Sequence, residues 1–210
     1  MKMSLKSAVA LMIALPSLAF ASNWDVDGSH SSAGFTVRHM MVSNVNGSFN
    51  VKSGTVNVDD KDITKSTVEA VLDATSVNTG NAKRDEHLKA PDFFDTAKHP
   101  TITFKSNKVE KAGEGKLKVS GDLTMHGVTK PVVLDVTGPT KESKDPWGNI
   151  RTGVTATTKL NRKDFGLTYN TALETGGVAV GEEVTVNLDL SLVKKQPAPA
   201  AKPATASDKK

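Results

Sequence analysis

Apolar and polar residues alternate with a period of two along most of the chain. Over Leu117–Met125 and again over Val184–Leu192, apolar side chains or glycine occupy every second position. This spacing puts the apolar side chains on one face of a strand. Short turns rich in glycine or polar residues separate the stretches, as at residues 113–115. The pattern predicts about eight strands, with turns short enough for antiparallel neighbours.

The strand around Val132–Val136 has an ambiguous phase, because Val133 interrupts the alternation with another apolar side chain. The phase that matches its neighbours points Val132, Leu134 and Val136 inward.

A sheet with one apolar face must cover that face, and a closed barrel or a two-sheet sandwich achieves this. Aromatic residues make up only 5% of the chain, so a wide core is hard to fill completely. An eight-stranded barrel either just fills its interior or holds one elongated ligand. We therefore expect an all-β, eight-stranded antiparallel barrel with a hollow interior, and we keep the sandwich as the alternative.

The segment between residues 84 and 104 breaks the alternation. Phe93 and Phe94 are adjacent and flanked by aspartates, which does not suit a strand with one wet face. We predict a short helical or looped flap over Asn81–Ala97, with both rings turned toward the apolar interior. The strand Thr101–Val109 is expected to follow it.

The first 21 residues have the features of a secretory signal peptide. Two lysines precede the apolar run Ala8–Leu15, and a small-x-small cleavage signal ends at Ala21. The run is short and is followed by Pro16, which argues against the alternative of a retained membrane anchor. We expect cleavage after Ala21 and export of the mature protein.

Residues 196–210 are rich in Pro, Ala and Lys, so we expect a disordered tail after a folded domain over residues 22–195. Without the signal peptide and residues 194–210, acidic residues slightly outnumber basic ones, which argues against nucleic-acid binding. The chain has no cysteine, which excludes thiol chemistry and cysteine metal sites.

Catalytic and metal-binding motifs are weak in this sequence. His87 lies beside Asp85 and Glu86, which would fit part of a hydrolytic zinc site, but further ligands would have to come from distant strands. Asp92 and Asp95 are spaced for an acid/base pair, yet helix capping by Asp92 and simple solvation explain them more simply. We predict no catalytic residue, no metal site and no cofactor.

Charged and aromatic residues near predicted loops suggest contacts at the barrel ends. Arg84 and Arg162 would suit the polar head of a ligand, with surface ion pairs as the alternative. We expect Trp24 and Trp147 to plug the barrel ends, with contact to lipid or to a partner as the alternative for Trp147.

Several segments, in order and at near-constant spacing over Asn23–Val193, resemble the YceI-like family. They are Trp24-Asp25-Val26-Asp27, Ser29-His30-Ser31, Phe35-Thr36-Val37-Arg38-His39-Met40, Val45-Asn46-Gly47-Ser48-Phe49, Ser76-Val77-Asn78-Thr79, Arg84-Asp85-Glu86-His87-Leu88, Pro91-Asp92-Phe93-Phe94-Asp95, Pro100-Thr101-Ile102-Thr103-Phe104, Gly121-Asp122-Leu123-Thr124-Met125-His126-Gly127-Val128-Thr129 and Asn161-Arg162-Lys163-Asp164-Phe165-Gly166. The resemblance implies a lipocalin-like antiparallel barrel exported to the periplasm. It also implies binding of a long isoprenoid or similar lipid, such as an isoprenoid quinone, and no established catalytic activity.

We therefore hypothesise a periplasmic carrier that sequesters an isoprenoid or related lipid in the barrel lumen. The alternatives are a lipid-modifying enzyme that uses polar groups in the lumen, and an interaction protein with a filled barrel that docks a membrane redox enzyme. A homodimer is one oligomeric state that the sequence allows. The strand phase and the flap predict these ligand-binding residues: Phe35, Val37, Leu72, Leu88, Phe93, Phe94, Phe104, Leu123, Leu134, Val154, Ala156 and Leu188, with Arg84 or Arg162 at the head group.

Overall fold

A computed structural model describes residues 21–174 and 176–196 of the chain. The predicted signal peptide, apart from Ala21, and the predicted tail, apart from Gln196, lie outside the described residues. Within those residues, no helix is both long enough and apolar enough to cross a membrane.

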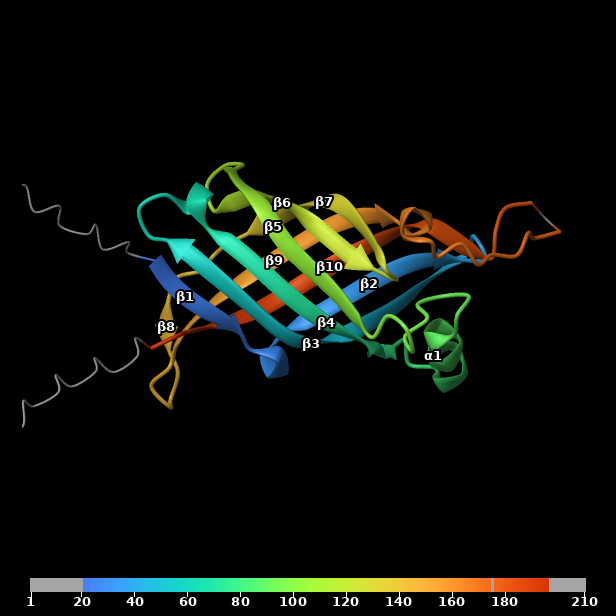
Figure 1. Ribbon diagram of the computed structural model, residues 1–210, viewed down its shortest axis with the longest axis horizontal. Helices are drawn as coiled ribbons and strands as arrows, with labels where there is room; N and C mark the ends of the chain where they lie inside the picture. The colour runs from blue at the N-terminus through green and yellow to red at the C-terminus, as the bar shows by residue number, and fades with distance from the viewer. Residues whose placement is uncertain (1–20, 175, 197–210) are drawn as a thin grey trace, which may run out of the picture.

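Eight antiparallel strands close a barrel, as predicted, and the sandwich alternative is wrong (Figure 1). Each strand pairs with the next around the ring, and β10 closes it by pairing with both β9 and β2. In ring order the strands are β2 (Ser32–His39), β3 (Ser43–Asp59), β4 (Thr67–Asn78), β5 (Thr101–Lys111), β6 (Lys116–Met125), β7 (Val128–Thr137), β9 (Ile150–Asn161) and β10 (Val180–Lys194).

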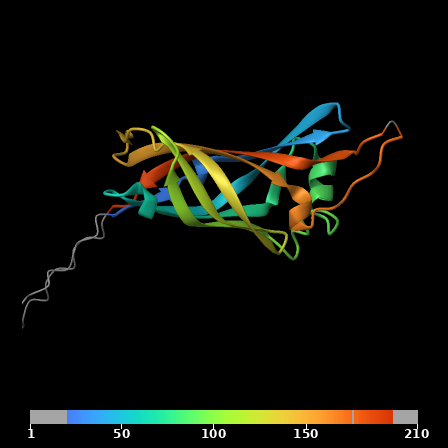
Figure 2. The same cartoon turned by 90° about the horizontal axis from the view of Figure 1, so that it is seen from above.

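Two short strands extend the ring. β1 (Ala21–Val26) pairs with both β10 and β3, so it continues the wall beyond Ser32, the first residue of β2. The 3-10 helix η1 (Gly28–His30) separates β1 from β2. β8 (Ser143–Lys144) pairs with β9. The pairing of Trp24 with Lys194 brings both described ends of the chain to one end of the barrel (Figure 2).

The strand phase follows the predicted alternation. In β6, Val119 is buried and its neighbour Lys118 is exposed. In β7, Val132 and Val136 are buried, whereas Val133 is 45% exposed. In β7, Val132 and Val136 therefore point into the barrel and Val133 points outward, which is the phase expected from the neighbouring strands.

The seam between β7 and β9 is only partly paired. Direct pairing covers Asp135–Thr137 of β7, and the 3-10 helix η3 (Arg162–Phe165) follows directly after β9 and contacts β7. Phe165 and Leu167 are almost fully buried and pack in one core cluster with Met125. This packing covers the end of the barrel where the strand ladder is incomplete.

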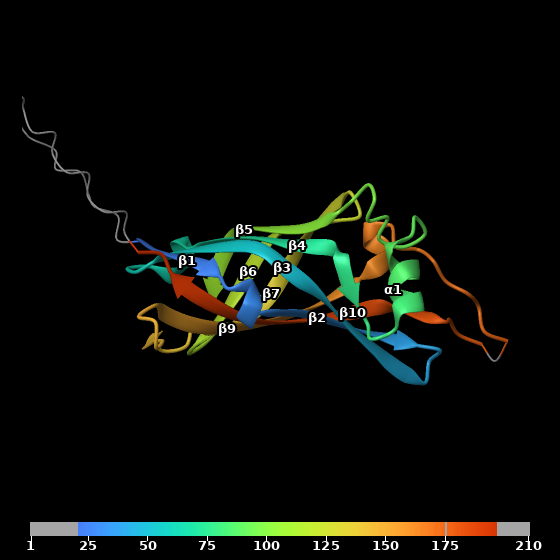
Figure 3. The same cartoon turned by 90° about the horizontal axis from the view of Figure 1, so that it is seen from below.

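The predicted flap is present at the other end of the barrel from the chain ends, as helix α1 (Ala82–Lys89) followed by turns (Figure 3). The Asn81 side chain accepts a hydrogen bond from the Arg84 N–H and caps the helix. The Phe94 N–H donates to the Leu88 carbonyl at 3.0 Å, which folds the following segment back against the helix. The suggestion that Asp92 caps a helix is wrong, because that residue follows α1.

One further 3-10 turn completes the described elements. η2 (Ile63–Lys65) joins β3 to β4, and the Asp62 side chain caps it by accepting from the Thr64 N–H. η2 contacts β5 and lies at the barrel end that also holds β1.

Candidate functional site

The barrel encloses a cavity of about 360 Å³. All eight barrel strands contribute to its wall, and β10 does so with alternate residues from Val184 to Leu192. The wall reaches from Trp24 near the chain ends to Leu88 in the flap helix. The cavity therefore follows the barrel axis and is walled mainly by aliphatic and aromatic side chains, as the period-two pattern predicted.

All of the predicted ligand-binding residues except Arg84 lie on the cavity wall. They are Phe35, Val37, Leu72, Leu88, Phe93, Phe94, Phe104, Leu123, Leu134, Val154, Ala156, Leu188 and Arg162. Their contact with a ligand stays a prediction.

The wall also contains residues that the predicted set omitted. Val56, Val68 and Val186 lie on it, and their phase in the alternating pattern is sufficient to find them. Leu167 lies on the wall too, but it follows η3 in a non-alternating segment. Only the packing of that segment against the partly paired seam identifies Leu167.

A row of packed aromatic rings closes the flap end of the cavity. The rings of Phe94 and Phe49 meet edge-on with centroids 5.3 Å apart, and Phe35 packs on Phe49 at 5.5 Å. Phe93 packs instead against Tyr169, with ring centroids 4.8 Å apart. Phe93 and Phe94 are buried, as the flap prediction required.

The opposite end of the cavity carries a few polar side chains on an otherwise apolar wall. Asp60, Ser66, Thr140 and Glu142 lie on the wall there, and the Ser22 hydroxyl donates to Asp60 Oδ1 at 2.8 Å. The middle of the wall is aliphatic by contrast. The cavity is thus almost wholly apolar, and the carboxylates on its described wall, Asp60 and Glu142, lie near β1 rather than near the flap.

The Arg162 side chain donates its hydrogen bonds to backbone carbonyls. Its guanidinium donates to the carbonyls of Gly181 at 2.9 Å and Val180 at 3.1 Å, and also to that of Leu167. Burial lowers the pKa of Arg162, which is only 4% exposed. Although Arg162 touches the cavity, its donors hold the loop between η3 and β10, which leaves little capacity for a head group.

Arg84 lies away from the cavity wall, in contrast to the prediction. Its Nε donates to Thr79 Oγ1 at 2.7 Å and a terminal nitrogen donates to the Thr79 carbonyl at 2.9 Å. Asp85 accepts from the Thr79 N–H. These contacts fix the turn before α1, which is a structural role and not contact with the lumen.

His87 and Asp85, which were considered for a zinc site, do not face a common space. Asp85 faces Thr79, whereas His87 Nε2 lies 2.8 Å from Asp92 Oδ2. Asp92 and Asp95 also have separate partners, because Asp95 pairs with Lys98. The candidate acid/base pair is therefore not formed by these two carboxylates.

The two tryptophans have different environments. Trp24 is 3% exposed and lies on the cavity wall, as predicted for a plug at a barrel end. Trp147 is 81% exposed in the turn after Asp145, so the prediction that it plugs the barrel is wrong. It projects from a loop that the Asp145 carboxylate holds through the Trp147 and Asn149 N–H groups.

Comparison with known proteins identifies the family. A family model described as YceI-like domain matches residues 24–192. A UPF0312 protein of Vibrio parahaemolyticus is 42% identical over 170 residues, which cover 80% of this chain and 89% of that protein.

Solved structures agree with this match. A Campylobacter jejuni YCEI protein is 31% identical with a TM-score of 0.61, covering 76% of this chain and 90% of that one. A polyisoprenoid binding domain from Saccharophagus degradans is 18% identical with a TM-score of 0.58, covering 82% of this chain and 98% of that one. At this identity, the likeness shows a shared fold and nothing more. The matched model, spanning nearly all of the barrel, and the identity to the Vibrio relative together show that the chain belongs to the YceI-like family.

Proposed function

We propose that this protein binds a long-chain lipid of the isoprenoid type in its barrel lumen and carries it through the periplasm. The observation that carries the proposal is the apolar cavity along the barrel axis, closed by Phe94 at one end and carrying the carboxylates of Asp60 and Glu142 at the other. An apolar chain gains free energy by leaving water for such a wall.

The expected binding energy comes from chain burial. Each buried methylene contributes about 0.8 kcal/mol, so a five-carbon isoprene unit contributes roughly 3–4 kcal/mol before ordering costs. A few units therefore offset the loss of ligand freedom, and further units add less once the lumen is full.

The carboxylates at one end of the wall suggest how the lipid is oriented. Ser22, Asp60 and Glu142 are the groups that would meet a head group, and the isoprenoid tail would point toward Phe94. This orientation replaces the earlier expectation of a head group at Arg84 or Arg162. A head group that donates hydrogen bonds fits this arrangement, because the carboxylates of Asp60 and Glu142 only accept them. The hydroxyl of a prenol, or the reduced quinol form of an isoprenoid quinone, supplies such a donor.

Two alternatives have less support. A filled barrel that docks a membrane enzyme requires an interior without space, whereas this interior is hollow. A lipid-modifying enzyme requires polar groups that converge on the lipid, whereas the middle of the wall is aliphatic. The polyisoprenoid-binding relative shares the fold but too little sequence to decide the ligand, so the proposal depends on the cavity.

Periplasmic location is part of the proposal and rests on the predicted signal peptide and the family. It is tested by fractionating cells that produce the full chain. Recovery of a shortened protein in the periplasmic fraction, with cleavage after Ala21, is the expected result.

The binding proposal is tested by native mass spectrometry of protein purified without detergent. We expect a co-purifying lipid of defined mass, released unchanged on denaturation. Leu123→Arg places a charge on the cavity wall and should abolish the adduct, whereas Asp122→Arg changes the exposed neighbour and should retain it. Ala156→Phe, an uncharged variant that occupies the lumen, should also reduce the adduct.

Circular dichroism and thermal unfolding establish that each variant is folded. A folded Leu123→Arg protein that carries the wild-type amount of lipid would contradict binding in the lumen. Recovery of a chemically altered lipid would favour the enzyme alternative.

A further inference from the structure

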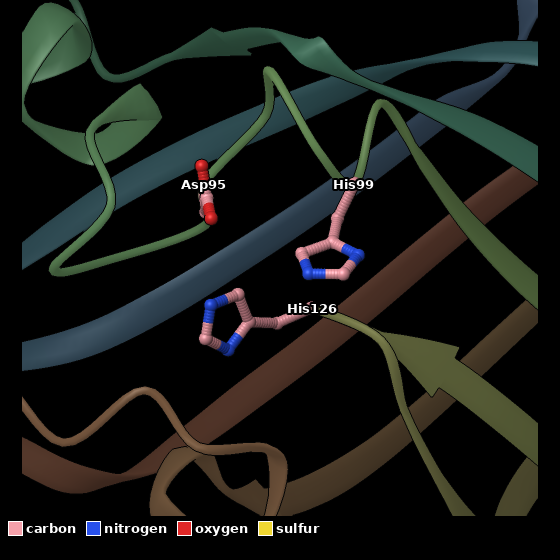
Figure 4. Close-up of side chains that lie close together, drawn as sticks. All are labelled: Asp95, His99 and His126. Carbon is pink, nitrogen blue, oxygen red and sulfur yellow. The ribbon is translucent and has the colours of Figure 1, made fainter.

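Three potential metal ligands converge beside the flap. Asp95, His99 and His126 each offer one ligand atom, and these atoms all lie within 4.8 Å of one another. Figure 4 shows the two imidazole rings and the carboxylate turned toward a common space. The sequence does not reveal this group of three, because His126 comes from a turn that is distant in the chain from Asp95 and His99.

Local backbone structure places the first two ligands. The N–H groups of Lys98 and His99 both donate to the Asp95 carbonyl, at 2.9 and 2.8 Å. This single turn brings residues four apart to the same side of the backbone. Asp95 and His99 are thereby held together in the segment that leads from the flap into β5.

The β6–β7 turn places the third ligand. His126 and Gly127 both have positive φ, 53° and 74°, as a two-residue hairpin turn requires. A Cβ on Gly127 would lie 2.7 Å from His99 Cε1. Glycine at this position therefore leaves room for the His99 ring against the turn, where it meets the His126 ring at a centroid distance of 5.2 Å.

The His126 ring has the orientation of a metal ligand. Its Nδ1 lies 3.1 Å from the Phe165 carbonyl, which can only accept, so in the neutral ring Nδ1 carries the proton. The Nε2 lone pair is then available, and Figure 4 shows one ring nitrogen turned toward Asp95. A histidine that ligates a metal commonly donates its other N–H to a backbone carbonyl in this way.

Asp95 supplies a shielded negative charge. The residue is only 6% exposed, and its Oδ2 pairs with Lys98 Nζ at 2.9 Å. The Lys98 side chain is 73% exposed, so its ammonium can move into water when another cation approaches Asp95. The carboxylate would then complete a ligand set of two nitrogens and one oxygen.

From this geometry we propose that Asp95, His99 and His126 form a binding site for a divalent transition-metal ion, with Zn²⁺ well suited to it. Two imidazoles and a carboxylate leave one tetrahedral position for water. Ligands about 2.1 Å from zinc lie about 3.4 Å apart in a tetrahedron, so small side-chain rotations suffice to close the site. The ion would fasten the flap, through Asp95, to the β6–β7 turn of the barrel.

The test is calorimetric titration of the metal-free full chain with Zn²⁺. We expect one ion per chain and a rise in the thermal unfolding temperature on adding zinc. His99→Gln and His126→Gln should each weaken binding at least tenfold. Cobalt(II) should give the intense visible absorption of a tetrahedral complex, and the same variants should lose it.

Two further variants separate this site from general surface binding. His87→Gln disrupts another histidine–carboxylate pair in the same flap, with Asp92, and should leave zinc affinity unchanged. Lys98→Gln removes the competing ammonium and should increase affinity severalfold.

The proposal is overturned if wild-type protein at saturating zinc shows neither heat of binding nor a change in unfolding temperature. It is also overturned if His87→Gln weakens binding as much as His126→Gln, because the flap surface would then be the binding site. Both readouts are independent of any bound lipid, so failure of the carrier proposal leaves this test intact.

Discussion

The ring of Phe94 meets the ring of Phe49 edge-on, with centroids 5.3 Å apart and planes at 84°. Phe49 belongs to β3 and Phe94 to the flap, so this contact joins the flap to the barrel wall. Aromatic pairs of this geometry are favourable beyond the area that they bury. Opening the flap end of the cavity must therefore break the Phe94–Phe49 contact.

Removing the Phe94 ring should loosen the flap. We expect Phe94→Ala to lower the free energy of unfolding by about 3 kcal/mol, since it deletes a buried aromatic side chain. Release of a fluorescent polyene lipid should become at least severalfold faster. Urea denaturation and stopped-flow fluorescence measure the two effects. Trp147→Ala removes an exposed ring and should change neither; unchanged release from Phe94→Ala would show that the flap does not close the cavity.

Ligand affinity should depend on chain length more than on the head group. Each added methylene should tighten binding roughly fourfold, from about 0.8 kcal/mol of burial, until the lumen is full. Displacement of a fluorescent lipid by a homologous series of prenols measures this slope. Head-group analogues of one chain length serve as the control, and a flat response to length would contradict burial of the chain in the lumen.

Replacing Arg162 should destabilise the loop that leads into β10. Arg162→Met removes the guanidinium donor from the carbonyls of Gly181, Val180 and Leu167, which should cost about 3 kcal/mol in free energy of unfolding. The Val180 carbonyl keeps the Asn170 side chain as a donor at 2.8 Å. Hydrogen exchange in residues 167–181 should accelerate. Arg84→Met, whose partner is Thr79, should leave exchange in that loop unchanged. Equal acceleration in both variants would contradict a specific anchoring role for Arg162.

Stability should fall in acid through two carboxylates that share Arg151. The Arg151 guanidinium, assisted by His30, lowers the pKa of Asp27 from its ordinary value of 3.8 to about 2, and Arg151 also lowers the pKa of Asp145. A lowered folded-state pKa stabilises the fold above the unfolded value, and this contribution is lost as pH falls toward the folded value. The loss should therefore occur between about pH 4 and about pH 2.

Urea midpoints across that range measure the acid effect. Arg151→Met should flatten the pH dependence, because both carboxylates lose their principal partner. Arg38→Gln is the control, since Arg38 contacts Asn44 and the Met41 carbonyl rather than a carboxylate. A steep acid loss that persists in Arg151→Met would assign it to other groups.

Local pattern determined the strands and their inward faces. Leu117, Val119 and Leu123 are separated by even numbers of residues, so strand geometry places them on one face of any sheet that contains them. The paired rings of Phe93 and Phe94 likewise marked the flap, because two adjacent aromatics do not suit a strand with a wet face. The signal peptide and the tail are sequence predictions that the described residues do not include.

Tertiary structure alone decided what the loops and polar side chains do. Arg84 and Arg162 are equivalent in sequence as loop arginines, but their partners, Thr79 and the carbonyls before and within β10, depend on which segments the barrel brings together. The convergence of His99 with His126 likewise depends on the flap folding back over the β6–β7 turn. The physical reason is range: strand alternation is a property of neighbouring residues, whereas these contacts join segments that become neighbours only when the barrel closes.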